Sequence, residues 1–215
     1  MTSKPFSQAI RERTWTDHGA SEGAGFMHDL MRGHGTREDY IALVVQHYFV
    51  YRALEAAVDR LAGDPVAAPF LSAELTRMPA LERDLEFLLG ADWREQVEAL
   101  PTAQRYVERI NAVADAGWAG GLVAHHYTRY LGDLSGGQAI RRMMQRYFGF
   151  ERAGVEFYMF DEIASPAEFK DGYRALLDAA PWDEAERERI IDEVVAAYRL
   201  NTELFEDMSA AKVAA

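Results

Sequence analysis

The stretch from Thr36 to Pro65 reads TREDYIALVVQHYFVYRALEAAVDRLAGDP. Its apolar and aromatic residues recur at alternating steps of four and three, the period of one helix face. They are Tyr40, Val44, His47, Tyr51, Leu54, Val58 and Leu61. Thr36 and Asp39 have the spacing of a capping box, and the Gly-Asp-Pro sequence ending at Pro65 is a stop signal. This stretch therefore predicts one long amphipathic helix whose apolar stripe faces the protein core.

Helical spacing continues along most of the 215-residue chain. The further segments that show it are 71–88, 101–114, 118–148, 165 onward and 190–208. Pro79 interrupts the first of these, and the aromatic run 157–160 is too short and isolated to build a sheet. This spacing predicts an all-α fold. Because there is no internal repeat or linker, we expect a single domain over residues 1–215. We expect a short flexible tail from about residue 210.

Composition excludes several classes of protein. The chain has no cysteine, which excludes disulfides, thiolate metal sites, iron–sulfur clusters and a cysteine nucleophile. The net charge of −12 argues against a nucleic-acid partner. Residues 1–7 lack the apolar core of a secretory signal, and no run approaches about eighteen consecutive apolar residues. We therefore expect a cytoplasmic protein without a membrane segment.

An unusual segment, Tyr127–Ile140, reads YTRYLGDLSGGQAI within a helical pattern. Each interior glycine costs about 1 kcal/mol relative to alanine, so its three glycines give up roughly 3 kcal/mol. Asp133 shares a helix face with Arg129 and with the glycines that follow. One interpretation is close helix packing or a kink. The other is a flat ligand that approaches the bare backbone beneath Asp133 and Arg129. A P-loop is excluded, since its lysine and strand are missing.

The strings AHHY at 124–127 and YLGDLSGGQ at 130–138 resemble the distal-helix signature of the heme oxygenase family. The resemblance covers nearly the whole chain, and bacterial members without a membrane tail match best in length. Its other parts are Tyr51–Glu55, Phe169-Lys170, Tyr173-Arg174, Asn201 and Phe205. It implies a multi-helical fold that holds heme b, at once substrate and cofactor, between a proximal helix and the glycine-rich distal helix.

The resemblance also implies which histidine binds the iron. Six histidines are present, and imidazole chemistry alone does not choose among them. The family's proximal helix has the His-x-x-x-Glu spacing of His18 and Glu22, so His18 is the expected axial ligand. Glu22 would then bond the imidazole N–H opposite the iron and fix the tautomer. We interpret His47, on the core stripe, and His125 as structural residues.

Heme carries two propionates, which require cations at one edge of the site. The resemblance implies Arg11, Lys170 and Arg174 as these cations, with Tyr127 as a hydroxyl donor. Family members often carry a lysine where Arg11 stands, so its guanidinium would grip the carboxylate differently. Without the resemblance, all three cations would be interpreted as solvated helix faces.

On the distal side, the resemblance implies that Asp133 is the catalytic residue, acting through an ordered water with Arg129 and Tyr51 as partners. Three glycines, which have no side chain, would leave room for oxygen over one ring edge and so steer it there. They are Gly132, Gly136 and Gly137. The implied reaction uses dioxygen and electrons to open heme at the alpha-meso carbon. Its products are biliverdin, carbon monoxide and ferrous iron.

Alternative functions remain to be weighed. A heme carrier or sensor of the same fold would not need Asp133. A TenA-like helical enzyme typically uses a cysteine, and a di-iron bundle uses Glu-x-x-His pairs; the chain has neither. No dinucleotide fingerprint or flavin site is visible, so we expect no bound flavin or nicotinamide and a separate reductase or ferredoxin as electron donor. Without a heptad seam, we expect a monomer.

Overall fold

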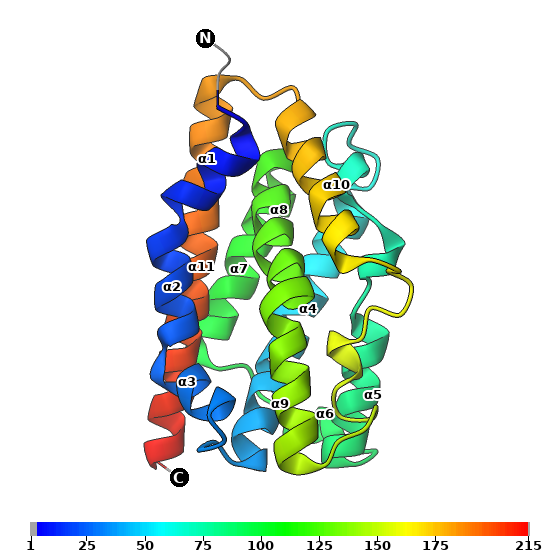
Figure 1. Cartoon of the computed structure of the whole chain (residues 1–215), viewed down its shortest axis with the longest axis vertical. Helices are drawn as coiled ribbons and strands as arrows, with labels where there is room; N and C mark the ends of the chain where they lie inside the picture. Colours follow the sequence, from blue (N-terminus) through cyan, green and yellow to red (C-terminus); the bar gives the residue numbers. More distant parts are fainter. Residues whose placement is uncertain (1–3, 215) are drawn as a thin grey trace.

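The structure is a computed structural model that describes residues 4–214, apart from the side chains of Glu22 and Ala214. Over these residues it contains helices and no strand, which confirms the all-α prediction (Figure 1). The α-helices are α1 Phe6–Arg13, α2 Trp15–Gly23, α3 Gly25–Met31, α4 Arg37–Leu61, α5 Met78–Leu89, α6 Trp93–Gln96, α7 Pro101–Asp115, α8 Ala119–His126, α9 Gln138–Phe148, α10 Pro166–Ala179 and α11 Glu184–Ala214. Short 3₁₀ turns cover Ala68–Phe70, Ala73–Leu75 and Glu156–Tyr158.

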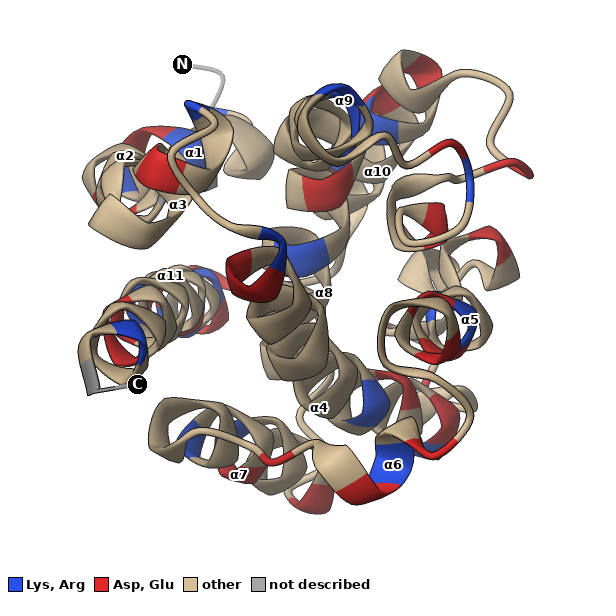
Figure 2. Ribbon diagram, turned by 90° about the horizontal axis from the view of Figure 1, so that it is seen from below, with Lys and Arg blue, Asp and Glu red and all other residues tan. Residues whose placement is uncertain are grey.

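Helix α4 is the central element of the core. It begins with the predicted capping box, in which Thr36 Oγ1 accepts from the Asp39 N–H at 3.1 Å and Asp39 Oδ2 accepts from the Thr36 N–H at 2.7 Å. It packs against α5, α7 and α8, and Figure 2 shows it inside the bundle. By length and composition alone it is the one described helix that could cross a membrane. Of its apolar window, 56% is buried inside this protein.

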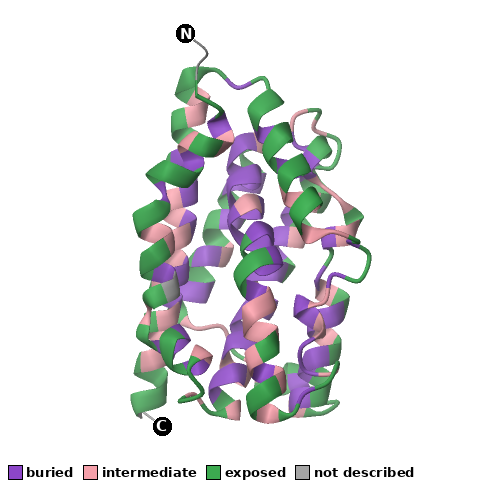
Figure 3. Cartoon of the chain, in the orientation of Figure 1, coloured by how far each residue is buried: buried purple, intermediate pink, exposed green. Residues whose placement is uncertain are grey.

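Helices α8 and α9 form one rod through the middle of the molecule, and Figure 3 shows that its α8 half is mostly buried while its α9 half is largely exposed or intermediate. Between them the backbone forms two wider π-helical stretches, Tyr127–Leu131 and Asp133–Gly137. Such stretches are rare and often occur at functional sites. The glycine-rich segment is therefore helical, as predicted, but its turns are wider than those of an α-helix.

Both interpretations of the glycines find support in the structure. A Cβ on Gly137 would lie 2.8 Å from Tyr158 Cδ1, so this glycine permits close packing. A Cβ on Gly132 would meet nothing within 4 Å and would project into open space. Gly137 thus permits close packing against Tyr158, and Gly132 leaves space beside the helix.

The structure departs from the sequence predictions at three places. Pro79 is the second residue of α5, where proline is tolerated, so it helps to begin a helix and does not interrupt one. The N-terminal helix expected around His18 is divided at Thr14 and Ala24 into α1, α2 and α3. The expected flexible tail from about residue 210 is helical as far as Ala214. Lys212 Nζ donates to Asp39 Oδ2 at 2.7 Å, which ties the end of α11 to the start of α4.

Candidate functional site

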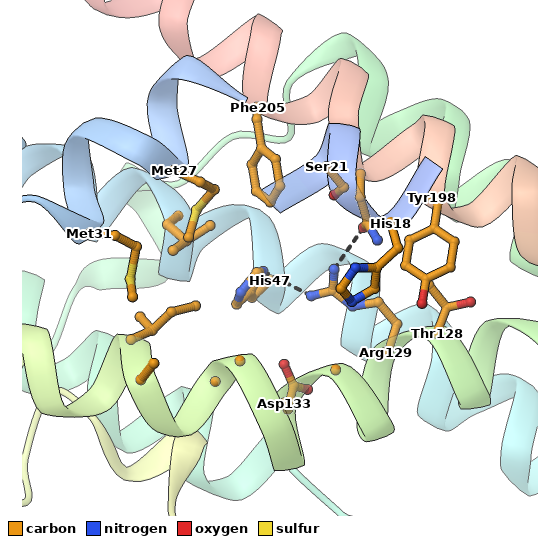
Figure 4. Close-up of a pocket in the computed structure, with 17 residues that line it drawn as sticks. His18, Ser21, Met27, Met31, His47, Thr128, Arg129, Asp133, Tyr198 and Phe205 are labelled. Atoms are coloured by element: carbon orange, nitrogen blue, oxygen red, sulfur yellow. Dashed lines mark hydrogen bonds between the residues drawn. The ribbon is translucent and has the colours of Figure 1, made fainter. Parts of the chain in front are cut away.

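A cavity of about 400 Å³ lies between the N-terminal helices and the glycine-rich rod (Figure 4). Helices α4 and α11 contribute the remaining walls. The lining residues are His18, Ser21, Met27, Met31, Leu43, His47, Thr128, Arg129, Gly132, Asp133, Gly136, Gly137, Ala139, Ile140, Tyr198, Asn201 and Phe205. Its volume falls in the range typical of small-molecule sites, about 300–1,000 Å³.

A second cavity of about 240 Å³ adjoins the first. The residues that line both cavities are His18, Gly132, Gly136 and Tyr198, so the two form one continuous cleft. Arg11, Tyr127 and Arg174 line only the second part, together with Trp15. The cleft therefore has a basic end, whereas methionine, leucine, isoleucine and phenylalanine side chains line its other end.

His18 stands on the side of the cleft formed by α2. Its ring stacks on Trp15 at a centroid separation of 6.1 Å and meets the edge of Tyr198 at 5.5 Å. These contacts orient the imidazole toward the rod that carries Gly132 (Figure 4). Glu22 lies in α2 as predicted, but its side chain, and with it the predicted contact to His18, is outside the described part of the structure.

Asp133 faces the same cleft from the rod. The Tyr51 hydroxyl, from α4, donates a hydrogen bond to its carboxylate. Burial raises the pKa of Asp133 to about 6, against the opposing effects of the Arg129 charge and the Tyr51 hydrogen bond. A carboxyl group with a pKa near the working pH can both accept and release a proton.

Arg129 completes the predicted trio. Its guanidinium lies over the Tyr51 ring, with Cζ 4.9 Å from the ring centroid. It donates from Nη1 to Asn201 Oδ1 at 2.8 Å and from Nη2 to His47 Nδ1 at 3.1 Å. Burial lowers its pKa, but Tyr51 and Asp133 outweigh this effect and leave the pKa raised. Arg129 is therefore a fixed positive charge beside Asp133.

His47 and Asn201 are site residues that the sequence analysis did not assign. His47 was interpreted as a structural core residue; it is buried as expected, yet it also lines the cavity and holds Arg129. The available signal was its position one turn before Tyr51 on the same stripe of α4. His125 is buried and bonds Glu193 Oε1 at 2.8 Å, which agrees with a structural role.

The predicted propionate-binding residues lie around the basic end of the cleft. Arg174 lines it and also pairs with Asp171 at 2.6 Å. Lys170 stands beside it, with Nζ donating to Ser135 Oγ at 2.8 Å. Burial raises the pKa of the Tyr127 hydroxyl, and the charges of Arg174 and Arg11 oppose this. The cations of α1 and α10 thus act on a single hydroxyl.

The cleft therefore combines an imidazole on one wall, bare helix backbone with a carboxylate on another, cations at one end and apolar side chains at the other. This combination suits a flat, largely apolar molecule with acidic groups along one edge and a central metal that an imidazole can coordinate. Heme fits each of these features.

Comparisons with known proteins agree with the geometry. Residues 4–207 match the family model described as heme oxygenase. The heme oxygenase 1 of Synechocystis sp. is 37% identical over 199 residues, covering 93% of this chain and 82% of the relative. Human heme oxygenase 1 is 38% identical over 205 residues, covering 94% and 71%.

Solved structures show the same likeness. The crystal structure of Synechocystis heme oxygenase-1 in complex with heme has a TM-score of 0.92 and 35% identity, covering 98% of this chain and 95% of that chain. The heme oxygenase from Leptospira interrogans has a TM-score of 0.89 and 31% identity, covering 94% and 98%. The chain belongs to the heme oxygenase family.

Proposed function

We propose that this chain is a heme oxygenase that opens heme at the alpha-meso carbon and forms biliverdin, carbon monoxide and ferrous iron. It would use dioxygen and electrons from a separate reductase or ferredoxin. The observation that carries the proposal is that His18 and Asp133 face one cleft from different walls, with Asp133 held by the buried Tyr51 behind it. Together they offer an axial ligand and a proton-handling group to a ligand bound between them.

Heme would be held by its centre and by one edge. His18 would bind the iron, and Glu22 would orient its imidazole. Arg11, Lys170 and Arg174 would bind the propionates at the basic end, which is supported by the position of Arg11 and Arg174 in the cleft lining.

The two ends of the cleft would set the orientation of the ring. The Tyr127 hydroxyl lines the basic end and would donate to a propionate there. The opposite, apolar edge of the porphyrin would lie against Met27, Ile140 and Phe205. Burial of this edge is favourable at about 25 cal/mol per Å² of apolar surface. The orientation of the ring thus follows from the unequal ends of the cleft.

The distal residues would manage protons. Bound heme supplies the iron at which dioxygen is activated. Tyr51 holds the Asp133 carboxyl in place, and Arg129 keeps a positive charge beside it. Asp133 would hold a proton at its carboxyl oxygen and exchange it through an ordered water. Gly132, Gly136 and Gly137 would leave space for oxygen to lie over one ring edge only.

A carrier or sensor of the same fold is the alternative. Asp133 argues against it, because burying a carboxyl group is costly and brings nothing to a passive binder. We further propose a cytoplasmic monomer whose electron donor contacts the arginines near His18. No membrane or nucleic-acid partner is proposed.

The test is an absorption spectrum of the purified protein with one equivalent of hemin, followed by a reductant in air. We expect a Soret band that gives way to the broad red band of biliverdin. A Soret band that forms and then persists would support the carrier, and no Soret band would contradict heme binding altogether.

A further inference from the structure

His47 is a second imidazole in the cleft. It comes from the middle of α4, whereas His18 comes from α2, and both rings are drawn in Figure 4. His47 is only 5% exposed and lies in the same cavity lining as Leu43, one turn earlier on α4. A polar ring at this depth requires hydrogen-bond partners, because an unsatisfied buried polar group costs about 1–3 kcal/mol.

Its partners determine where its proton lies. A guanidinium can only donate, so Nδ1, 3.1 Å from Arg129 Nη2, must accept. Burial, and then the charge of Arg129, hold the pKa of His47 well below its usual value, so the ring is neutral. Its single proton is therefore on Nε2, which lies 3.5 Å from the Tyr158 hydroxyl oxygen. This N–H donates to Tyr158 and leaves the hydroxyl proton of Tyr158 to be donated elsewhere.

Tyr158 is fixed next to Asp133. A Cβ on Gly137 would lie 2.8 Å from Tyr158 Cδ1 and 3.4 Å from Asp133 Cβ, so both side chains flank this one position. The Tyr158 carbonyl accepts from Gln138 Nε2 at 2.8 Å, which attaches the turn carrying Tyr158 to the rod. The hydrogen bonds thus run from Arg129 through His47 to the Tyr158 hydroxyl, on a side chain that flanks Gly137 together with Asp133.

We propose that His47 is a positioning residue for heme cleavage, which fixes one arm of Arg129 and occupies the acceptor side of the Tyr158 hydroxyl, so that this hydroxyl is free to donate. The inference rests on the proposed function of the cleft. Asn201 holds the other arm of Arg129, at 2.8 Å from Nη1. Loss of His47 would remove the acceptor of Nη2 and leave the guanidinium held by Asn201 and the Tyr51 ring alone.

The first test uses the protein without heme. Nitrogen-15 NMR of histidine-labelled protein reports the tautomer of each ring, and His47→Gln identifies the His47 signals by their loss. We expect a neutral ring with the proton on Nε2 that does not titrate between about pH 5 and about pH 8. A proton on Nδ1, or titration near the ordinary value, would overturn the proposal.

The second test measures biliverdin formation by the heme-loaded protein. His47→Leu should be slower by about tenfold, with heme affinity within about threefold of the wild type. His47→Gln should recover most of the rate, because a glutamine amide can accept from Arg129 and donate to Tyr158. His28→Gln is the matched control on an exposed histidine.

Wild-type speed in His47→Leu, or equal slowness in the leucine and glutamine variants, would overturn the positioning role. If the wild type forms no biliverdin, the proposed function itself fails. The NMR measurement then decides by itself whether His47 carries its proton on Nε2.

Discussion

At the scale of single residues, the site depends on a carboxyl group placed where ionisation is unfavourable. Asp133 is buried among Tyr51, Arg129 and the helix backbone, and burial raises its pKa to about 6. The family resemblance named Asp133, Arg129 and Tyr51, and the structure brings these three side chains together. Their arrangement was not predictable, because sequence spacing does not show that Tyr51 donates to Asp133 or that Arg129 is held between Asn201 and His47.

Replacing Asp133 by asparagine should separate binding from turnover. The amide keeps the shape and the acceptor for Tyr51 but cannot exchange a proton, so biliverdin formation should fall by about 10²-fold or more. Heme affinity should stay near that of the wild type, measured by absorption titration. Asp115→Asn, on an exposed side chain, is the control. Wild-type turnover in Asp133→Asn would remove Asp133 from the mechanism.

The same substitution has a consequence for stability. The pKa of Asp133 rises from 3.8 to about 6 on folding, so the folded state binds more protons between these values and wild-type stability falls as pH rises through them. The asparagine amide does not ionise. Heme-free Asp133→Asn should therefore be more stable than the wild type at neutral pH, by about 2–3 kcal/mol, and the difference should vanish near pH 4. Urea unfolding at both pH values measures it, and a difference independent of pH would contradict the burial effect.

At the scale of elements, the rod formed by α8, the π-helical stretches and α9 has two faces with different tasks. Both Gly132 and Gly137 border the cleft, but Gly137 also packs against Tyr158 of the turn Glu156–Tyr158, while Gly132 has open space beside it. The sequence correctly predicted that this segment is helical despite its glycines. It could not predict the π-helical turns of Tyr127–Leu131 and Asp133–Gly137, because apolar spacing does not distinguish a short wider turn from the α-helix around it.

The two glycines should therefore respond oppositely to alanine. Gly137→Ala forces a methyl group against Tyr158 and should destabilise the protein by about 1–3 kcal/mol. Gly132→Ala meets open space and should gain up to about 1 kcal/mol from helix propensity, while its methyl group occupies the ligand's space and weakens heme binding. Thermal unfolding and hemin titration of both variants check this. Equal stability changes would show that the two faces do not differ.

The turn Glu156–Tyr158 is itself held by Asp84 of α5. The buried Asp84 carboxylate accepts from the backbone N–H groups of Gly154, Glu156 and Phe157 at 2.8, 3.0 and 2.8 Å. Asp84→Ala leaves these donors without their acceptor and should destabilise the protein by about 2–4 kcal/mol. Urea unfolding measures the change, with Asp115→Ala as the exposed control. A loss below about 0.5 kcal/mol would show that the turn is held by other contacts.

At the scale of the whole molecule, the sequence was sufficient for the fold class and the core stripe of α4. It could not assign His47, because the core face of α4 and the wall of the cleft are the same face. It also missed the breaks at Thr14 and Ala24, because the proximal helix around His18 was expected from the resemblance and not from a local stop signal. Local patterns thus predicted the helices, and the cleft between them depended on how they pack.

Electron delivery belongs to this scale as well. The chain has a net charge of −12, yet Arg11 and Arg13 lie in the last turn of α1, and Arg199 of α11 pairs with Asp17, next to His18 in the chain. If an acidic donor docks there, kcat/KM for that donor should fall steeply as ionic strength rises above about 0.1 M, because screening shortens the reach of these charges. Steady-state kinetics with a ferredoxin and its reductase measure it. Salt-independent values would exclude an electrostatic contact.

The most direct test of the central claim is chromatography of the product from wild-type protein that has turned over one equivalent of heme with dioxygen and a reductant. The account predicts biliverdin of the alpha isomer as the main product, with carbon monoxide and ferrous iron released alongside it. Another biliverdin isomer would contradict the proposed steering by the distal glycines. Recovery of intact heme would contradict the proposed heme oxygenase activity.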